Sequence, residues 1–295
     1  MTERNAEESA ITASLEQHQG DLVTEARGTT VTDIGAPKTP TRSRPRRGLR
    51  ILVVAGGLVL LALVLVISYF ALWALGRSTD SQTETFSGPI DQVIVEDVNG
   101  RVTFEAGMST EVTVEREWLF GNAPDVQIVE NDGTLRITAN CGSFCQTHIT
   151  GTAPADAGIL IRTEAGYIDV TGFAGGVDLN TSAGHVNVTD ISGPARLRSD
   201  AGSIRGNISD GNVDAQTSAG VIDLEVVGDF SRISAVSDAG SVELTVPDRV
   251  YRVEAETSAG RTDVNVSTAP DAARVIIARS SAGNVTIDRS TGGSS

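Results

Sequence analysis

The segment Thr163-Glu-Ala-Gly-Tyr-Ile-Asp-Val170 carries the pattern that decides the fold. The pattern Thr/Ser-x-Ala-Gly-x-apolar-x-apolar occurs seven times between residues 159 and 288, with Gly206 and Thr262 at two of the apolar positions. Its glycines lie 18, 18, 18, 20, 20 and 23 residues apart, at Gly166, Gly184, Gly202, Gly220, Gly240, Gly260 and Gly283. A regular period of about 20 residues is typical of solenoid folds.

Each repeat predicts two strands that meet at a corner. Val177, Leu179 and Thr181 alternate with polar residues before one Ala-Gly, and Val186 and Val188 alternate after it, one step out of phase. Period two indicates strands, and the change of phase indicates a corner, where glycine supplies a positive φ. We therefore predict an all-β solenoid of 18–20-residue coils over residues 161–289, with one sheet on each face and an inward ladder of Thr and Ser hydroxyls. An ordinary β-sandwich would not need the same Ala-Gly seven times.

Residues 86–160 repeat less regularly and predict a capping region at one end of the stack. Asn99-Gly100 follows one alternating segment and precedes another, so it can replace Ala-Gly as a corner. This region also contains both cysteines, Cys141 and Cys145. With no other thiol in the chain, they predict a structural disulfide that pins a turn. A zinc site would need further ligands, and only His148 is near.

Residues 51–75 form 25 consecutive positions without a charge. A helix of this length spans about 37 Å, more than the roughly 30 Å hydrocarbon core of a bilayer. The segment therefore predicts a transmembrane helix that contacts the lipid bilayer. A cleaved signal peptide is the alternative, but its apolar region is shorter and would not follow 50 residues.

The charges that flank this segment predict its orientation. Five arginines precede it, whereas Arg77 alone follows it closely. The positive-inside rule then places the N-terminus in the cytoplasm and residues 77–295 outside. Residues 1–50 predict a disordered cytoplasmic tail, residues 76–85 a linker and residues 290–295 a disordered C-terminus. The five arginines are Arg42, Arg44, Arg46, Arg47 and Arg50.

The charge of the chain excludes one class of partner. Residues 77–295 hold 15 Arg and 31 acids, a balance of −16, within a chain of net charge −15. Such a domain repels phosphate backbones, so we expect no nucleic-acid partner. The pattern of residues indicates no cofactor, metal cluster or nucleophile motif. The outward aspartates Asp169, Asp178, Asp214 and Asp223, with His185 after one corner, favour a solvated face over paired catalytic carboxylates.

The repeats, preceded by a Cys pair and a strand with Pro154, resemble the bacterial putative-adhesin family of β-strand-repeat domains of unknown function. The resemblance covers about residues 86–288 and the single N-terminal anchor. It implies a surface-exposed β-solenoid and supplies no catalytic residues. The short Cys loop, Gly206 and Thr262 depart from the family pattern.

These observations favour a non-enzymatic, adhesin-like structural or interaction module of the bacterial cell envelope, which binds an unidentified surface ligand or protein. The alternative is a transmembrane envelope-stress sensor or signalling accessory. Deleting residues 1–40 separates the two, because only a signalling protein needs its tail. An extracytoplasmic carbohydrate-active enzyme is a third interpretation, to be tested by substituting one outward row of aspartates.

Overall fold

The computed structural model describes residues 57, 59–71, 78–119, 122–140 and 145–290. Residues 57 and 59–71 are helical, and no helix in this described part has both the length and the apolar character needed to cross a bilayer. The predicted span 51–75 extends on both sides into residues outside the description. The predicted tail, its five arginines, Cys141 and residues 291–295 also lie outside it.

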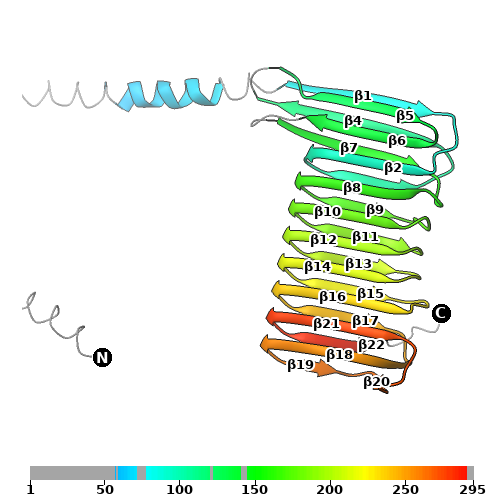
Figure 1. Cartoon of the computed structure of the whole chain (residues 1–295). Coiled ribbons are helices and arrows are strands. Elements are labelled where there is room, and N and C mark those ends of the chain that lie inside the picture. Colours follow the sequence, from blue (N-terminus) through cyan, green and yellow to red (C-terminus); the bar gives the residue numbers. More distant parts are fainter. Residues whose placement is uncertain (1–56, 58, 72–77, 120–121, 141–144, 291–295) are drawn as a thin grey trace, which may run out of the picture. The chain divides into compact units, whose positions relative to one another are not determined.

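Outside the helix, the described part of the chain confirms the prediction of an all-β fold. Its strands form two 11-stranded sheets (Figure 1). Sheet A contains, in spatial order, β1 (Ser78–Phe86), β4 (Thr110–Trp118), β7 (Cys145–Ala153), β3 (Val102–Ala106), β9 (Ile168–Thr171), β11 (Val186–Ile191), β13 (Ile204–Ile208), β15 (Ile222–Val226), β17 (Val242–Val246), β22 (Val285–Arg289) and β19 (Thr262–Val264). Sheet B contains β5 (Asp125–Asn131), β6 (Thr134–Asn140), β2 (Gln92–Asn99), β8 (Gly158–Ala165), β10 (Val177–Ala183), β12 (Ala195–Ala201), β14 (Val213–Ala219), β16 (Arg232–Ala239), β21 (Val275–Ala282), β18 (Val250–Ala259) and β20 (Ser267–Thr268).

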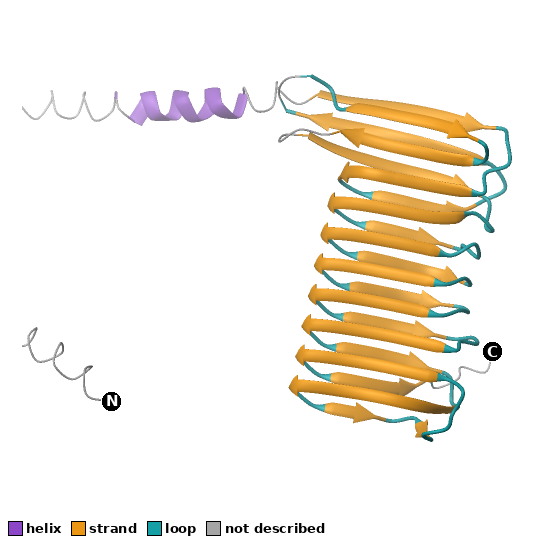
Figure 2. Cartoon of the chain, viewed as in Figure 1, coloured by secondary structure: helices purple, strands orange, loops and turns teal. Residues whose placement is uncertain are grey.

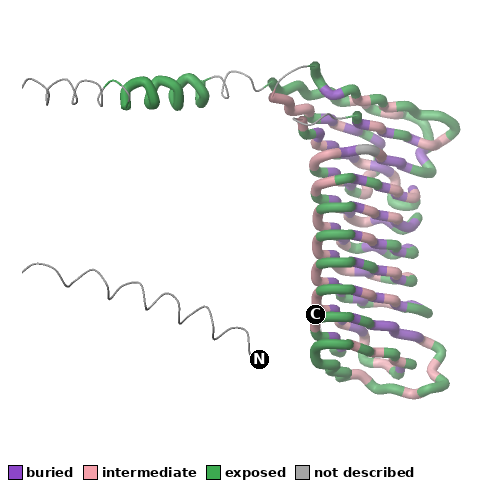
Figure 3. Tube along the Cα trace, turned by 60° about the vertical axis from the view of Figure 1, so that its left-hand side comes forward, coloured by how far each residue is buried: buried purple, intermediate pink, exposed green. Residues whose placement is uncertain are grey.

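Each coil adds one strand to each sheet, and successive coils pair in parallel (Figure 2). The alternating apolar residues point between the sheets: Leu179 and Leu197 are fully buried, as are Val188 and Ile222. Their polar neighbours along the strands are partly or fully exposed (Figure 3). The core is therefore a narrow layer of Val, Ile, Leu and Ala, which explains the scarcity of aromatic residues.

The seven Ala-Gly corners stack in one column. At each step a glycine N–H donates to the alanine carbonyl of the next coil, as from Gly166 to Ala183 and from Gly184 to Ala201. A Cβ on any of the seven glycines would lie 1.6–2.4 Å from the carbonyl oxygen of the neighbouring corner glycine. Glycine is needed at every corner because the backbones touch.

A positive φ was predicted as the reason for glycine at the corners, but it explains only part of the requirement. Four of the seven glycines have φ between +147° and +157°, namely Gly166, Gly202, Gly240 and Gly283. Gly184, Gly220 and Gly260 do not adopt a left-handed φ. Steric contact between coils is the condition that all seven share. The Asn99-Gly100 corner joins the same column, because the Gly100 N–H donates to the Ala165 carbonyl.

The inward Thr and Ser residues stack in register as the predicted ladder, but their hydroxyls do not bond to one another. Ser199 and Thr217 instead donate to the carbonyls of Gly184 and Gly202 in the neighbouring coil, at 2.9 Å in both cases. Ser237, Ser280 and Thr257 likewise donate to a corner glycine carbonyl of the adjacent coil. The Thr163 and Thr181 hydroxyls are buried without a hydrogen-bond partner in the described structure. The hydroxyls therefore tie each coil to the corner of its neighbour.

The last two coils stack in the reverse of their sequence order. Strands β21 and β22 lie between β16–β17 and β18–β19. The coil of residues 275–289 therefore lies between the coil that precedes residue 250 and the coil of residues 250–264. The inserted coil is the more apolar one, because it has the buried residues Val275 and Ile277 at the positions that pair with Arg252 and Glu254. The end coil has Arg252 and Glu254 on its surface. This order buries the more apolar coil between two neighbours and leaves the charged coil at the end.

Three features that depart from the sequence-based predictions or from the repeat pattern have structural reasons. Residues 78–85, predicted as part of a linker, form most of β1, an edge strand antiparallel to β4 whose polar composition gives no period-two signal. Gly206 has φ +150°, and a Cβ there would lie 1.9 Å from the Val188 carbonyl oxygen. Thr262 is exposed because it belongs to the end coil.

Candidate binding groove

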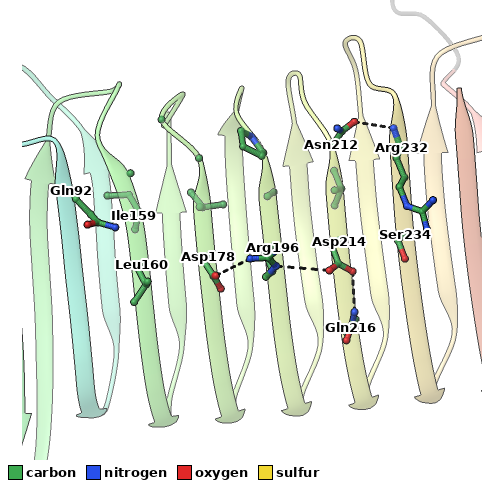
Figure 4. A pocket seen from close by; sticks show the side chains of 17 residues that line it. Gln92, Ile159, Leu160, Asp178, Arg196, Asn212, Asp214, Gln216, Arg232 and Ser234 are labelled. Atoms are coloured by element: carbon green, nitrogen blue, oxygen red, sulfur yellow. Dashed lines mark hydrogen bonds and ion pairs between the residues drawn. The ribbon is translucent and has the colours of Figure 1, made fainter. Parts of the chain in front are cut away.

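A groove of about 860 Å³ crosses the outer face of sheet B (Figure 4). It runs over β8, β10, β12, β14 and β16, so it follows the stack rather than any single strand. Charged and amide side chains lie beside apolar lining residues, which include Leu160, facing outward from β8, and Pro194 at a turn. Its polar lining includes Gln92, Asp178, Arg196, Asn212, Asp214, Gln216, Arg232 and Ser234.

Glycines at the coil turns leave the floor of the groove without side chains. Gly158, Gly175 and Gly176 line it. Gly176 has φ +94°, which favours glycine, and a Cβ on Gly175 would lie 2.1 Å from the Asp156 carbonyl oxygen. The close packing of successive turns therefore requires glycine, and the missing side chains leave a hollow beside the charged row.

An alternating row of acids and arginines fills the middle of the groove. The Arg196 guanidinium lies 3.3 Å from the Asp178 carboxylate and 4.0 Å from that of Asp214. The Asp214 carboxylate also forms an ion pair with Arg198 at 3.5 Å and accepts a hydrogen bond from the Gln216 amide at 3.0 Å. These side chains are about one-third to one-half exposed. Each pair therefore adds less than about 1 kcal/mol of stability. The pairs restrict the side chains and neutralise the carboxylates.

The same alternation continues beyond the groove. Glu96 on β2 binds Arg136 and Arg162 on its two neighbouring strands. Near the other end of the sheet, Arg279 binds Glu254 and Glu256. The outer face of sheet B is thus an ion-paired surface along the stack, in contrast to the solvated row of acids that the sequence indicates for Asp178 and Asp214.

The outer face of sheet A has a different character. Asp169, Asp223 and Glu243 project from it, and none forms an ion pair with a described residue. Thus the four outward aspartates singled out by sequence divide between two faces: two are paired with arginine on sheet B, and two remain solvated on sheet A. No described part of the chain gathers three His, Cys, Asp or Glu side chains suited to a metal ion.

The sequence-predicted site residues lie elsewhere. The seven corner glycines form one edge of the stack, away from the groove. Cys145 begins β7 opposite Trp118 and is not a free thiol, but Cys141 lies outside the described residues, so their disulfide stays a prediction. The sequence did not indicate the groove, because its lining comes from outward positions and turn residues that vary between repeats.

No family model matches this sequence, and no curated protein does. Solved structures with some likeness include one titled a putative cell adhesion protein from Clostridium sporogenes, with 9% identity over 72% of this chain and 100% of that chain and a TM-score of 0.33. A putative adhesin from Bacteroides fragilis has 17% identity over 72% and 97%, with a TM-score of 0.38. A putative lipid binding protein from Parabacteroides distasonis has 13% identity over 72% and 96%, with a TM-score of 0.36.

Proposed function

We propose that this protein is a membrane-anchored, extracytoplasmic β-solenoid that acts as a non-enzymatic interaction module of the cell envelope. The observation that carries the proposal is the groove on sheet B. It continues across five coils, and ion pairs hold its lining in place. A continuous groove that combines charged, amide and apolar groups along a repetitive stack suits an extended partner, such as a cell-wall polymer or an extended peptide.

The chemistry of the lining favours polar recognition. Amide, carboxylate and guanidinium groups supply both donors and acceptors within one hollow, as Gln216, Asp214 and Arg196 do. Asn212 is already engaged, because its carbonyl oxygen accepts from the N–H groups of Ser231 and Arg232 at 2.9 Å.

The location is tested by protease treatment of intact cells that carry the full chain. We expect cleavage within residues 77–295 without cell lysis. Protection of that region in intact cells, with cleavage only after lysis, would refute the extracytoplasmic location.

The groove is tested by filling it. Ser234→Trp places a large side chain in the groove, whereas Thr245→Trp places one on the outer face of sheet A in the same coil. The readout is retention of the full-length protein, in detergent micelles, on isolated envelope fragments of the same cells. We expect Ser234→Trp to reduce retention at least tenfold and Thr245→Trp to leave it unchanged. Equal effects of the two variants would show that the groove is not the binding surface.

A further inference from the structure

The residues that follow the corner glycines form a second column along the corner edge. In stacking order they are Arg101, Tyr167, His185, Ser203, Val221, Ser241, Asn284 and Arg261. His148 of β7 precedes Arg101 in the column, because Ile149 pairs with Val102. Four successive layers near the N-terminal end of the stack therefore carry His148, Arg101, Tyr167 and His185, which we call the donor row.

The side chains of the donor row are ordered by stacking. The Arg101 guanidinium carbon lies 5.3 Å from the centre of the Tyr167 ring, within the range of a cation–π contact. The Tyr167 ring centre lies 5.2 Å from that of His185, with the rings tilted by 36°. All four members line one hollow of about 430 Å³, together with Asn99 and Gln146. Tyr167 is 49% exposed there.

Hydrogen bonds fix the tautomers of the two histidines. His148 Nδ1 accepts the Arg101 backbone N–H at 3.2 Å, and His185 Nδ1 accepts the Ser203 backbone N–H at 3.0 Å. An accepting Nδ1 carries no proton, so the proton of each neutral ring is on Nε2. Each histidine thus offers an Nε2–H donor. A metal ion binds an Nε2 atom that carries no proton, whereas here Nε2 is protonated. The row is therefore suited to a ligand that accepts hydrogen bonds and not to a cation.

The charge of the row points in the same direction. Arg101 is exposed and forms no ion pair with a described residue. Its guanidinium and the two imidazole donors thus form a local donor surface on an acidic domain. The wider negative charge is screened beyond about 8 Å at physiological salt, so it does not prevent contact with an anion.

We infer that the donor row binds an acidic sugar of an extended polysaccharide. The planar guanidinium of Arg101 fits a carboxylate, which it can hold through two parallel hydrogen bonds. The hollow has the volume of a small-ligand site, and the amides of Asn99 and Gln146 can donate to and accept from sugar hydroxyls. This site lies on the corner edge, so it is separate from the groove and does not depend on the groove's function.

The test is calorimetric titration of the full-length protein in detergent micelles with a glucuronic acid oligosaccharide. A neutral glucose oligosaccharide of the same length and inorganic phosphate are the comparison ligands. We expect saturable binding of the acidic oligosaccharide with a Kd below about 1 mM. Binding should weaken at least tenfold in Arg101→Gln. The matched control is Arg261→Gln, which removes the arginine at the other end of the same column and should leave binding unchanged.

A second variant separates ligand contact from folding. His185→Asn keeps an oxygen that can accept the Ser203 N–H, as Asn284 does for the Arg261 N–H at 3.1 Å, but it removes the Nε2–H donor. We expect weaker binding and unchanged circular dichroism. Absence of binding, equal binding of the neutral oligosaccharide, stronger binding of phosphate, or equal losses in Arg101→Gln and Arg261→Gln would each overturn the inference. Ser234→Trp, which blocks the groove, should leave this binding intact.

Discussion

Gly184→Ala tests whether contact between backbones, rather than backbone conformation, requires glycine at the corners. Gly184 does not adopt a left-handed φ, so alanine meets no conformational penalty there. A Cβ would lie 1.6 Å from the carbonyl oxygen of Gly166 and 2.7 Å from its carbonyl carbon. Both are backbone atoms, so no side-chain rotation relieves the clash. The two coils must move apart.

The size of the effect follows from what that movement weakens. The hydrogen bonds from the Gly166 N–H to the Ala183 carbonyl and from the Ile168 N–H to the His185 carbonyl, both at 2.9 Å, join these two coils at the point of separation. Each contributes about 1 kcal/mol net, and overpacking a close-packed interior costs about 1–3 kcal/mol. We therefore expect Gly184→Ala to lower the free energy of unfolding by about 3–5 kcal/mol.

The measurement is urea unfolding of the full chain in detergent micelles, followed by far-ultraviolet circular dichroism. Gly158→Ala is the matched control: Gly158 also lacks a left-handed φ, and its nearest atoms would lie 3.9 Å from a Cβ. This control should change stability by less than about 0.5 kcal/mol. If the two variants unfold at the same urea concentration, the steric explanation of the corner glycines is wrong.

Three further predictions concern the inward hydroxyls, a buried phenol and the ion-paired row. Thr217→Val removes a hydrogen bond to the Gly202 carbonyl and should cost about 1 kcal/mol, whereas Thr181→Val removes a buried hydroxyl that has no partner and should be neutral or stabilising. Urea midpoints decide between them, and a larger loss for Thr181→Val would contradict the assignment. Burial raises the pKa of Tyr251, against opposing effects of nearby arginines, and its hydroxyl donates to the Pro247 carbonyl at 2.7 Å. The folded state therefore favours the neutral phenol, a contribution that is complete below the unfolded pKa of about 10 and lost as pH rises through the higher folded pKa. Melting temperatures should fall with alkaline pH more steeply in the native chain than in Tyr251→Phe; parallel curves would refute this. Arg196→Gln should change the free energy of unfolding by less than about 1 kcal/mol, because its ion pairs are half-exposed. A loss well above that in the same urea assay would show that the row is structural.

The features of the fold that could be predicted are those that leave a local pattern in the sequence. The Ala-Gly spacing placed the corner column, and Asn99-Gly100 could be recognised because a Gly after a short polar residue serves the same turn. The order of the last two coils could not be predicted in this way. Coils with equivalent corners and inward residues can pair with any neighbour. Only a contrast at equivalent positions, such as Val275 against Arg252, indicates which coil lies inside. β1 has no apolar alternation to detect.

The candidate sites were harder to predict than the fold. The groove depends on turn glycines such as Gly175, which contribute by lacking a side chain. The donor row depends on His148, which lies outside the repeats, so only the pairing of β7 with β3 brings it beside Arg101. Aligning the repeats on their glycines does place Tyr167 and His185 in consecutive layers. That was the one signal available from sequence for this row.

The reversed order of the final coils has a consequence for biogenesis. A ribosome releases residues 275–289 after residues 250–264, yet the later segment lies between the earlier one and the rest of the stack. The terminal layer therefore cannot reach its final position until residues 275–289 have been made. A nascent chain that stalls before residues 275–289 are made lacks the layer between β16–β17 and β18–β19. Completion of the stack thus depends on the segment that is made last of the two coils.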